Sequence, residues 1–431
     1  MAEKKVLIVS YYWPPAGGPG VQRWLKFAKY LPEFGWSPTV FIPQNPSYPL
    51  MDESLVDEVP EGISTIRTPI WEPYQWAEKL NKNNKKYKAG QFDVGHHQNW
   101  KSKLSIWVRG NFFIPDARVF WVRPSVNFLK KHLREHSYEA LVTTGPPHSL
   151  HLIGLKLKRH FPDLKWIADF RDPWTEISYY KHLKLTSWAD RKHRVLEEKV
   201  FKTADLTLAT SFTDAENFRK KGANAVCLTN GFDKEAQLVA PSPKSKRFAI
   251  SYIGVLEQLR TPKILWQALE ELVGESPDFK SDLEIRFVGR VDEKIAHTLK
   301  STLLSSAVYS TGYLSHQEAL EEMANAALLL LTNFPEAHSR GIIPGKLFEY
   351  LASGKPILSF GPNGADVARI LEETHSGSHF TYDEKEKVKT FILETYRQWK
   401  NHDTVCNFSR TDIESYSRRA LTKKLSEILQ R

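Results

Sequence analysis

The sequence has few cysteines and no long apolar run. Cys227 and Cys406 are its only cysteines, too few for a disulfide framework or a cysteine metal site. No run of about 18 apolar residues occurs, so we expect no transmembrane helix. The opening residues Met-Ala-Glu-Lys-Lys lead straight into an apolar strand and contain no long apolar signal segment. We therefore expect a cytoplasmic protein.

A dinucleotide fingerprint is also missing. The loop from Trp13 to Gly20 contains Gly17, Gly18 and Gly20, and this spacing differs from the G-x-G-x-x-G pattern that binds dinucleotides. The loop still allows a close approach of the backbone to a ligand, and a helix is expected to begin beside it. An NAD-dependent dehydrogenase is disfavoured, while a purely structural tight turn stays open.

Composition indicates a globular protein with an uneven charge distribution. The 431 residues suffice for two domains with full cores, and the formal net charge is +10. The stretch Trp71 to Arg123 holds ten Lys or Arg against four Asp or Glu, together with eleven aromatic residues. This composition is typical of a peripheral contact with an anionic membrane.

Two other interpretations of that stretch stay open. Its aromatics can belong to the core, with the lysines between Lys79 and Lys88 in a solvated loop. Alternatively, its aromatics can stack on bases. No helix-turn-helix, zinc-finger or RNP-type pattern supports the latter, so we expect no nucleic-acid partner.

Strands and helices alternate along the chain, which predicts an α/β protein with Rossmann-like units. After the turn at 361–366 we expect only helix up to Arg431. The expected strands of the first half are Val6–Ser10, Thr39–Ile42, Glu139–Thr143, Trp166–Ala168, Asp205–Ala209 and Val226–Leu228. Those of the second half are Phe248–Ile253, Leu283–Val288, Val308–Tyr313, Ala326–Leu331 and Ile357–Phe360.

One helix of the second half indicates a ligand. Pro344 and Gly345 can open it, and Gly354 ends it. Lys346 in its first turn opposes the helix dipole, so this lysine is tolerated more easily beside an anion such as phosphate. Glu349 lies near the same face and can accept hydrogen bonds from sugar hydroxyls. An ordinary surface Lys-Glu pair is the alternative.

The stretch Lys-Leu-Phe-Glu-Tyr-Leu-Ala-Ser-Gly-Lys-Pro from Lys346 closely resembles the nucleotide-sugar-binding helix of the GT-B glycosyltransferases, in particular the group 1 or family 4 retaining enzymes. The resemblance implies that Glu349 binds the ribose of the donor. The first Glu of the family signature maps onto Gly341, so half of that signature is missing. Its contribution then has to come from elsewhere or from backbone N–H groups of Gly341, Ile342 and Ile343.

The same resemblance extends to the first strand of the second half. In the family, a glycine there is followed by an Arg and, five residues later, by a Lys, and both cations clamp the donor diphosphate. In this sequence Gly254 is followed by Val255, and Arg260 matches the second cation. The resemblance therefore implies that Arg260 and Lys346 neutralise the diphosphate. An ordinary surface arginine is the alternative for Arg260.

In the first half, the loop with Gly17 and Gly18 resembles the glycine-rich loop that faces donor and acceptor in the family. His148 follows a strand and can bond a sugar hydroxyl or phosphate, or can be a capping or surface histidine. Asp169 takes roughly the place of a family histidine that faces the transferred sugar. We expect Asp169 or Asp172 to touch substrate, although Arg171 can also pair with Asp172 and fix the loop.

The resemblance implies the GT-B fold, with two Rossmann-like doubly wound domains facing across a cleft. We expect an acceptor-side domain over 1–235, with the basic aromatic insertion at about 71–123, and a nucleotide-sugar domain over 236–405. Residues 406–431 are expected to form a C-terminal helix that packs back on the first domain.

The function implied is transfer of a sugar, most simply from a UDP-sugar, to a glycan or glycolipid acceptor in cell-surface assembly, with retention. We expect neither a metal nor a cofactor besides this substrate, and no Asp-x-Asp motif of the metal-dependent GT-A class is present. The expected location is the cytoplasm, with contact to the inner face of the cell membrane. The alternatives are a nucleotide-sugar 2-epimerase using Asp169 and Asp172, and a non-enzymatic module that binds membrane or nucleic acid.

Overall fold

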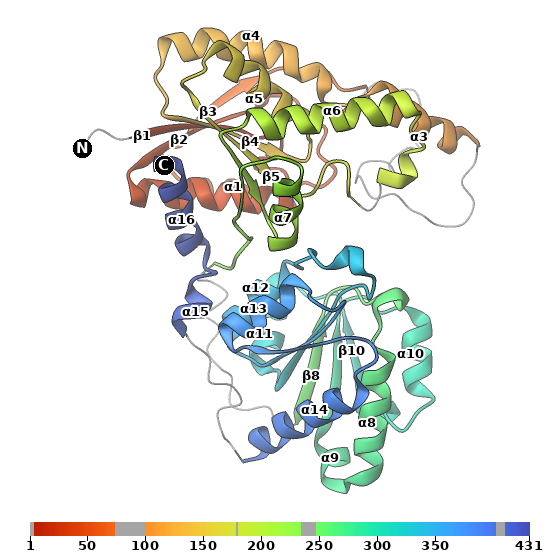
Figure 1. The fold of residues 1–431 in the computed structure, drawn as a ribbon. Helices are drawn as coiled ribbons and strands as arrows, with labels where there is room; N and C mark the ends of the chain where they lie inside the picture. Colours follow the sequence, from red (N-terminus) through yellow and green to blue (C-terminus); the bar gives the residue numbers. More distant parts are fainter. Residues whose placement is uncertain (1–3, 74–99, 178–179, 234–246, 402–409) are drawn as a thin grey trace. The chain divides into compact units, whose positions relative to one another are not determined.

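The computed structural model describes residues 4–73, 100–177, 180–233, 247–401 and 410–431 (Figure 1). They form two compact units. Unit 1 comprises 1–229 with 422–431, and unit 2 comprises 230–421. The predicted domain boundaries at 235/236 and 405/406 lie outside the described residues. No helix in the described part of the chain combines the length and the apolar character that crossing a bilayer requires.

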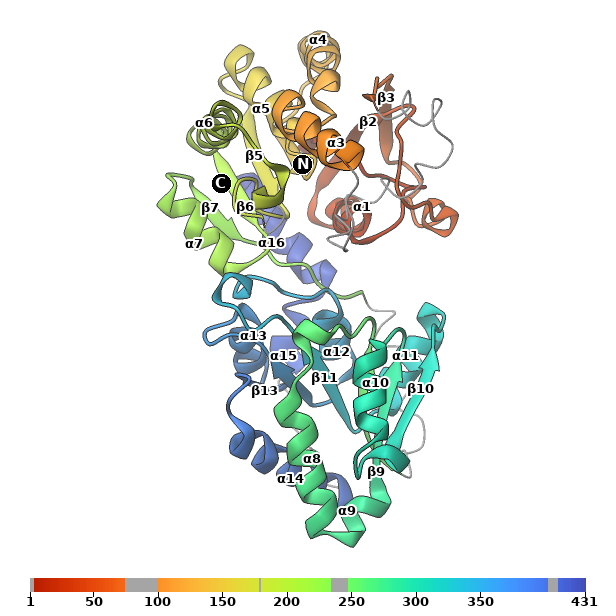
Figure 2. The same cartoon turned by 90° about the vertical axis from the view of Figure 1, so that its right-hand side faces the viewer.

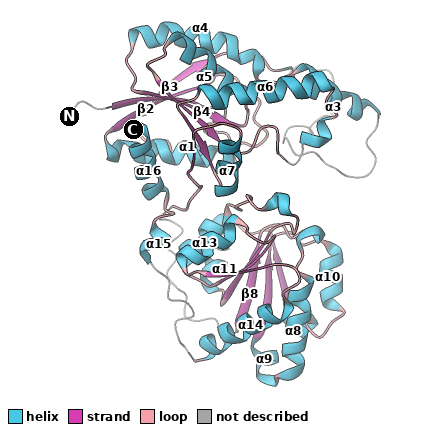
Figure 3. Cartoon of the chain, in the orientation of Figure 1, coloured by secondary structure: helices cyan, strands magenta, loops and turns pink. Residues whose placement is uncertain are grey.

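Unit 1 is built on a parallel sheet of seven described strands in the order β3-β2-β1-β4-β5-β6-β7 (Figure 3). Apolar runs predict strands buried on both faces, and β1 meets this expectation, because its residues from Val6 to Val9 are fully buried. The strands are β1 (Lys4–Val9), β2 (Trp36–Pro43), β3 (Ser64–Thr68), β4 (Ala140–Gly145), β5 (Lys165–Phe170), β6 (Leu206–Ala209) and β7 (Ala225–Cys227).

Helices cover both faces of this sheet. Side chains of α4, α5, α6 and α7 share one core with Leu7, Leu141 and Phe170. Figure 1 shows α1 and α16 on the face opposite α4 and α5. The helices are α1 (Pro19–Tyr30), α3 (Trp100–Phe112), α4 (Val119–Glu135), α5 (Ser149–His160), α6 (Ser187–Thr203), α7 (Phe212–Lys220) and α16 (Arg418–Gln430), whose residues from 422 onward belong to unit 1.

Unit 2 repeats the plan with six described strands in the order β10-β9-β8-β11-β12-β13. They are β8 (Phe248–Ile253), β9 (Leu283–Val288), β10 (Val308–Gly312), β11 (Leu328–Thr332), β12 (Ile357–Phe360) and β13 (Gly377–Phe380). Its helices are α8 (Lys263–Glu275), α9 (Pro277–Asp282), α10 (Glu293–Lys300), α11 (His316–Asn325), α12 (Lys346–Ser353), α13 (Asp366–Thr374), α14 (Lys385–Lys400) and α15 (Arg410–Glu414).

Each sheet has a point where the strand order reverses. In unit 1 this point lies between β1 and β4, and in unit 2 between β8 and β11. At such a switch point the connections leave in opposite directions, which opens a crevice at the carboxyl ends of the strands. The loops after β1 and β4, and those after β8 and β11, are therefore the places where ligands are expected.

Two expectations about the elements are wrong. Residues 361–431 are not wholly helical, because β13 joins the sheet beside β12. It escaped notice because it has four residues, and among them only Phe380 is both apolar and buried. The basic aromatic stretch is also not a separate insertion throughout, since Phe120 and Trp121 lie on α4, which packs on the sheet. Lys79 to Lys88 and Trp76 lie outside the described residues.

Candidate functional site

The switch point of unit 2 gathers the predicted cation positions. Gly254 directly follows β8, Arg260 closes the short helix η6 (Gln258–Arg260), and Lys346 opens α12. Gly254 has φ +119°, a conformation that L side chains rarely adopt. A Cβ placed on Gly254 would lie 3.4 Å from Nζ of Lys346. A glycine here therefore leaves the space in front of the lysine open.

The amino group of Lys346 turns back toward the sheet. Its Nζ donates to the carbonyl oxygen of Ile253 at 2.9 Å and lies 3.9 Å from the centroid of the Tyr252 ring. Both contacts favour a cation. The side chain is half-buried, and α12 places it at a helix N-terminus that lacks a side-chain cap.

The charged form of the Lys346 amine is disfavoured at this position. Burial, and then the nearby Arg260, lower the pKa of Lys346 from 10.5 to about 7, while Glu349 acts in the opposite direction. Two cations close enough to affect each other, beside a helix N-terminus, form a region of strong positive potential. An anion that enters this region relieves the repulsion and restores the ordinary pKa of the lysine.

Arg260 is held loosely on the same edge. Its terminal nitrogen donates to the carbonyl of Val255 at 3.0 Å and pairs with the exposed carboxylate of Glu257 at 3.3 Å. Its guanidinium carbon lies 5.5 Å from the centroid of Phe334. An exposed ion pair of this kind contributes about 0–1 kcal/mol. A bound phosphate can therefore replace Glu257 as the ion-pair partner of Arg260.

The loop after β11 is fixed by side chains that the sequence did not indicate. The amide of Asn333 donates to the carbonyl of Ile342 at 2.9 Å, and Tyr382 donates to the carbonyls of Asn333 and Arg260. The N–H of Ile342 donates to Ser339 at 3.0 Å, so in this conformation it is not available to a donor sugar. Asn333 lies two residues after the predicted strand Ala326–Leu331 and directly after β11, and that position was the signal by which it could have been found.

The remaining predicted residues of unit 2 stay candidates. Gly341 and Ile343 flank the bonded Ile342 in the loop before α12 and are half-buried. Glu349 lies one turn after Lys346 and is also half-buried. Ser315 and Glu318 form the expected capping box at the start of α11, which gives them a structural role.

In unit 1 the glycine-rich loop is tied to the segment after β2. The N–H of Gly17 donates to the carbonyl of Leu50 at 2.9 Å. A Cβ on Gly17 would lie 2.9 Å from Cγ of Leu50 and 3.2 Å from Cβ of Asp52. Gly18 has φ +92° and precedes α1. The structural explanation therefore accounts for Gly17, whose N–H is not free to bind a phosphate.

Asp169 does not lie open to a substrate. Side chains of a strand alternate, and Asp169 points toward α1, away from the core that holds Phe170. It is fully buried and accepts hydrogen bonds from Arg23 at 2.9 Å, Trp24 at 2.7 Å and Thr144 at 2.9 Å. Arg23 in turn donates to the carbonyl of Thr229 at 2.9 Å. Asp169 therefore anchors α1 to the sheet, and a substrate contact by Asp169 or Asp172 stays a prediction.

Arg171 also differs from expectation, because its described bonds go to backbone carbonyls. It donates to Gly20 at 2.9 Å and to Pro146, which joins the glycine-rich loop to the loop after β4. Asp172 beside it is exposed. Of the two predicted carboxylates, Asp172 is thus the one that a substrate can reach.

His148 is not a surface residue; it occupies the N-cap position of α5, but its side chain makes no capping hydrogen bond. It is buried, and its ring stacks on Trp174 with centroids 5.3 Å apart and an interplanar angle of 2°. Burial, and then the nearby His151, lower the pKa of His148 well below its ordinary value, so the ring is neutral. The His148 side chain therefore fixes the loop after β4 by packing against Trp174.

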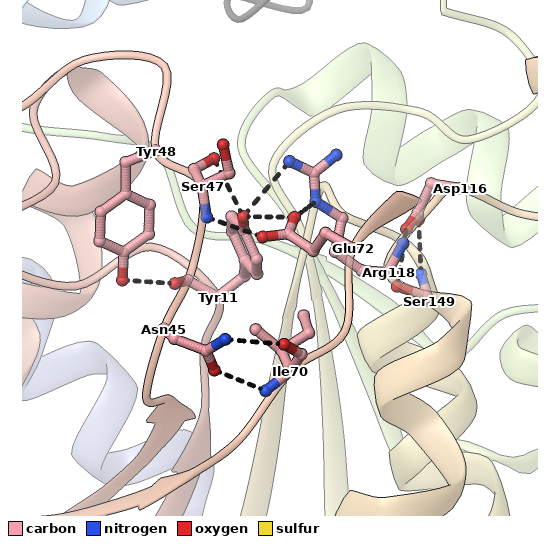
Figure 4. Close-up of polar contacts among 9 residues, drawn as sticks. All are labelled: Tyr11, Asn45, Ser47, Tyr48, Ile70, Glu72, Asp116, Arg118 and Ser149. Carbon is pink, nitrogen blue, oxygen red and sulfur yellow. Dashed lines mark hydrogen bonds and ion pairs between the residues drawn. The ribbon is translucent and has the colours of Figure 1, made fainter. Parts of the chain in front are cut away.

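A buried polar network, which the sequence did not indicate, borders the same edge (Figure 4). Glu72 is fully buried and accepts hydrogen bonds from Tyr11 at 2.8 Å and from the N–H of Ser47 at 2.7 Å. Arg118 pairs with Glu72 at 3.0 Å, and its guanidinium carbon lies 4.7 Å from the Tyr11 ring centroid. The network fixes the wall beside the loop that follows β1.

No protein-family model matches the chain, and no curated protein matches it by sequence. Solved structures do match. HepE of Anabaena in complex with UDP has 14% identity and a TM-score of 0.60, with 99% of each chain covered. A glycosyltransferase of Rickettsia africae has 13% identity and a TM-score of 0.58, covering 100% of this chain and 98% of its own. Sucrose-phosphate synthase of Thermosynechococcus elongatus has 14% identity and a TM-score of 0.57, with 99% and 98% covered.

These matches extend over both units, and each unit has the parallel sheet of a Rossmann-like domain. The chain therefore has the GT-B fold, as the sequence predicted. The nearer resemblance to the family 4 retaining enzymes stays a prediction.

Proposed function

We propose that this protein is a glycosyltransferase that takes its sugar from a UDP-sugar. The observation that carries the proposal is the pair of cations, Lys346 and Arg260, at the switch point of unit 2. They lie beside the uncapped N-terminus of α12, where a diphosphate is favoured by both charge and dipole. The GT-B fold supports this assignment, and HepE, which has been solved with UDP and with UDP and glucose, suggests the nucleotide.

In the proposed reaction the bond between the sugar C1 and the β-phosphate oxygen breaks, and the electron pair stays on the phosphate. The acceptor hydroxyl oxygen forms the new bond to C1, and its proton passes to an oxygen of the leaving diphosphate. Negative charge therefore grows on the leaving diphosphate in the transition state, and Lys346 and Arg260 meet that charge. Glu349 binds ribose hydroxyls, and the open face of Gly254 lets the phosphate approach the lysine.

We assign acceptor binding to the strand-end loops of unit 1. Asp172 is the exposed carboxylate there and can hold the acceptor hydroxyl. His148, Arg171 and Asp169 position this edge through the contacts described above. A glycan or glycolipid acceptor, a cytoplasmic location, independence of metal, and retention of configuration remain predictions from the sequence. The epimerase alternative, which needs proton-transferring carboxylates, is disfavoured because Asp169 is fully engaged with Arg23, Trp24 and Thr144.

The first test is nucleotide binding by the purified full chain. UDP, GDP, ADP and NAD are added in parallel, because a ligand that binds the native state raises the unfolding temperature. We expect UDP to raise it, Lys346→Ala to abolish the effect, and the exposed Lys300→Ala of unit 2 to leave it unchanged. Lys346→Ala is expected to fold, because it removes a half-buried amine whose charged form is disfavoured.

The second test is catalysis. Release of UDP from a panel of UDP-sugars is measured with and without glycan or glycolipid acceptors. Loss of one group that stabilises transition-state charge lowers kcat by about 100-fold, so we expect this loss in Lys346→Ala. A chain that binds no nucleotide, or that binds UDP equally well without Lys346, would disprove the proposed site.

A further inference from the structure

α3 turns an apolar stripe toward solvent. Leu104, Trp107 and Phe112 are between 37% and 68% exposed, and the rings of Trp107 and Phe112 meet with centroids 5.7 Å apart. Ile106 and Gly110 occupy the packed side of the helix. A helix that covers a core normally shows the reverse pattern, with its polar side outward.

A second group of aromatic rings adjoins the C-terminal end of α3. Phe113 lies next to Phe112, its ring meets that of Phe120 at 5.8 Å, and Phe120 meets Trp71 at 4.7 Å. Trp71 and Phe120 are exposed. Grouped exposed rings are uncommon on a soluble surface and mark an interaction site. We call the set Trp71, Leu104, Trp107, Phe112, Phe113 and Phe120 the aromatic face.

Basic side chains lie on the segment that packs against α3. The short helix η4 (Tyr180–Leu183) and the start of α6 pack against α3. Lys181, Lys184, Arg191 and Lys192 are exposed there. The acidic residue of this segment, Asp190, is occupied by Arg194 and Tyr180. Trp188 is also exposed, with the amino group of Lys192 at 4.7 Å from its ring centroid.

Helix α3, which carries aromatic residues, is bonded to residues 183–186 of the basic segment. The side chain of Asn111 on α3 donates to the carbonyl of Lys184 at 3.2 Å and accepts from the N–H of Thr186 at 2.7 Å. A Cβ on Gly110 would lie 2.9 Å from the carbonyl oxygen of Leu183 and 2.7 Å from a methyl carbon of Leu185. The close approach of α3 to residues 183–186 therefore needs glycine, and the surface is preformed.

We propose that this surface docks on an anionic lipid bilayer. Exposed tryptophan and phenylalanine side chains enter the interfacial region of a bilayer, while neighbouring lysines and arginines reach lipid phosphates. Lys181, Lys184, Arg191 and Lys192, which pair with no carboxylate among the described residues, supply the complementarity to anionic headgroups. The argument uses residues of unit 1 alone and does not depend on the proposed sugar transfer.

The test is co-sedimentation of the full chain with vesicles. Vesicles of phosphatidylcholine alone are compared with vesicles that also contain phosphatidylglycerol, at low and at high salt. We expect binding to the anionic vesicles that salt weakens, because the electrostatic part of the attraction is screened. Trp107→Ser with Phe112→Ser, and separately Lys181→Glu with Lys192→Glu, should each reduce it by about tenfold.

Matched controls lie on unit 2. Tyr313→Ser removes a side chain that is 93% exposed, and Lys300→Glu reverses one exposed charge; both should bind vesicles as the parent does. Unchanged unfolding temperatures show that the variants are folded. Equal binding of parent and surface variants, or no vesicle binding by the parent, would overturn the proposal. So would a self-association or a nucleic-acid affinity that the same substitutions abolish while vesicles stay unbound.

Discussion

The surroundings of Lys346 favour its charged form only when an anion is bound beside it. Its pKa falls to about 7 because burial and Arg260 disfavour the ammonium form, although the Tyr252 ring and the carbonyl of Ile253 attract it. At neutral pH the charged and the neutral form of the side chain are therefore both populated. A diphosphate that arrives beside it favours the charged form, so binding and protonation are linked.

This linkage predicts how UDP binding depends on pH. The free site has a lysine pKa of about 7, and the bound site a higher one, so binding takes up a proton between the two values. Affinity is greatest below pH 7 and is expected to fall by roughly tenfold per pH unit above it, until the bound pKa is reached. Isothermal titration calorimetry in buffers of different ionisation enthalpy measures the proton uptake. A pH-independent affinity in Lys346→Met, with weaker binding overall, is the matched control.

The buried pair of Arg23 and Asp169 makes a second residue-scale prediction. Removing one partner leaves a buried charge without compensation, so Asp169→Asn or Arg23→Met alone should destabilise unit 1 by about 3–5 kcal/mol. The double variant should cost clearly less than the sum of the two, because neither charge is then left alone. Urea unfolding of the parent and the three variants gives the coupling energy. Strictly additive losses would contradict the pairing.

At the scale of elements, α12 ends at the C-cap residue Gly354, whose backbone has the left-handed conformation. Gly354 has φ +64°, and a Cβ there would meet nothing within 4 Å, so the cost of a side chain is conformational alone. We expect Gly354→Ala to destabilise unit 2 by about 1 kcal/mol.

Gly274 on α8 is the matched control. A Cβ there also meets nothing within 4 Å, but its φ is not in the left-handed region. Gly274→Ala should therefore stabilise unit 2 by about 0.5–1 kcal/mol through helix propensity. Urea unfolding followed by circular dichroism measures both variants, and a change of the same sign in the two would refute the explanation.

Sequence periodicity located α12 well, because its signals are local. Gly345 and Gly354 delimit the helix as expected, and β11 and β12 flank it. The strand β13 could not be recognised, since Gly377 is needed for a close contact with the neighbouring strand β12: a Cβ on it would lie 2.0 Å from the carbonyl oxygen of Ile357. Such a requirement arises only when the sheet is assembled.

The candidate site was predictable to a similar extent. Lys346 and Gly254 were found because family motifs mark them, and they lie together at the switch point. The contacts of Asp169 with α1 were not foreseen, because proximity to a strand end does not reveal which face of the sheet a side chain enters. Glu72 and Arg118 were not recognised, since 45 residues of sequence separate two groups that pair at 3.0 Å.

At the scale of the whole molecule, unit 1 is completed by the last ten residues of the chain, 422–431. Leu425 and Leu429 are buried, and Nζ of Lys165 donates to the carbonyl of Ile428 at 2.6 Å. Burial of two leucines contributes about 3–6 kcal/mol.

Deleting residues 422–431 is therefore expected to lower the unfolding temperature of unit 1 and to leave that of unit 2 nearly unchanged. Differential scanning calorimetry measures both transitions, and addition of UDP identifies the transition of unit 2. The double substitution Lys423→Ala with Lys424→Ala, which removes two exposed side chains of the same segment, is the control for loss of charge. Equal shifts of both transitions would argue against the assignment of this segment to unit 1.

The chain's return to unit 1 at residue 422 also has a consequence for its synthesis. A domain that is continuous in sequence can fold while the ribosome is still translating the next one. Unit 1 is denied this advantage, since the helix segment that carries Leu425 and Leu429 is made only after unit 2. Unit 2 is finished first, and the nascent unit 1 keeps an uncovered apolar patch until residues 422–431 have left the ribosome. Chaperones that recognise such patches are therefore expected to engage this protein late in translation, and to do so more strongly when residues 422–431 are removed.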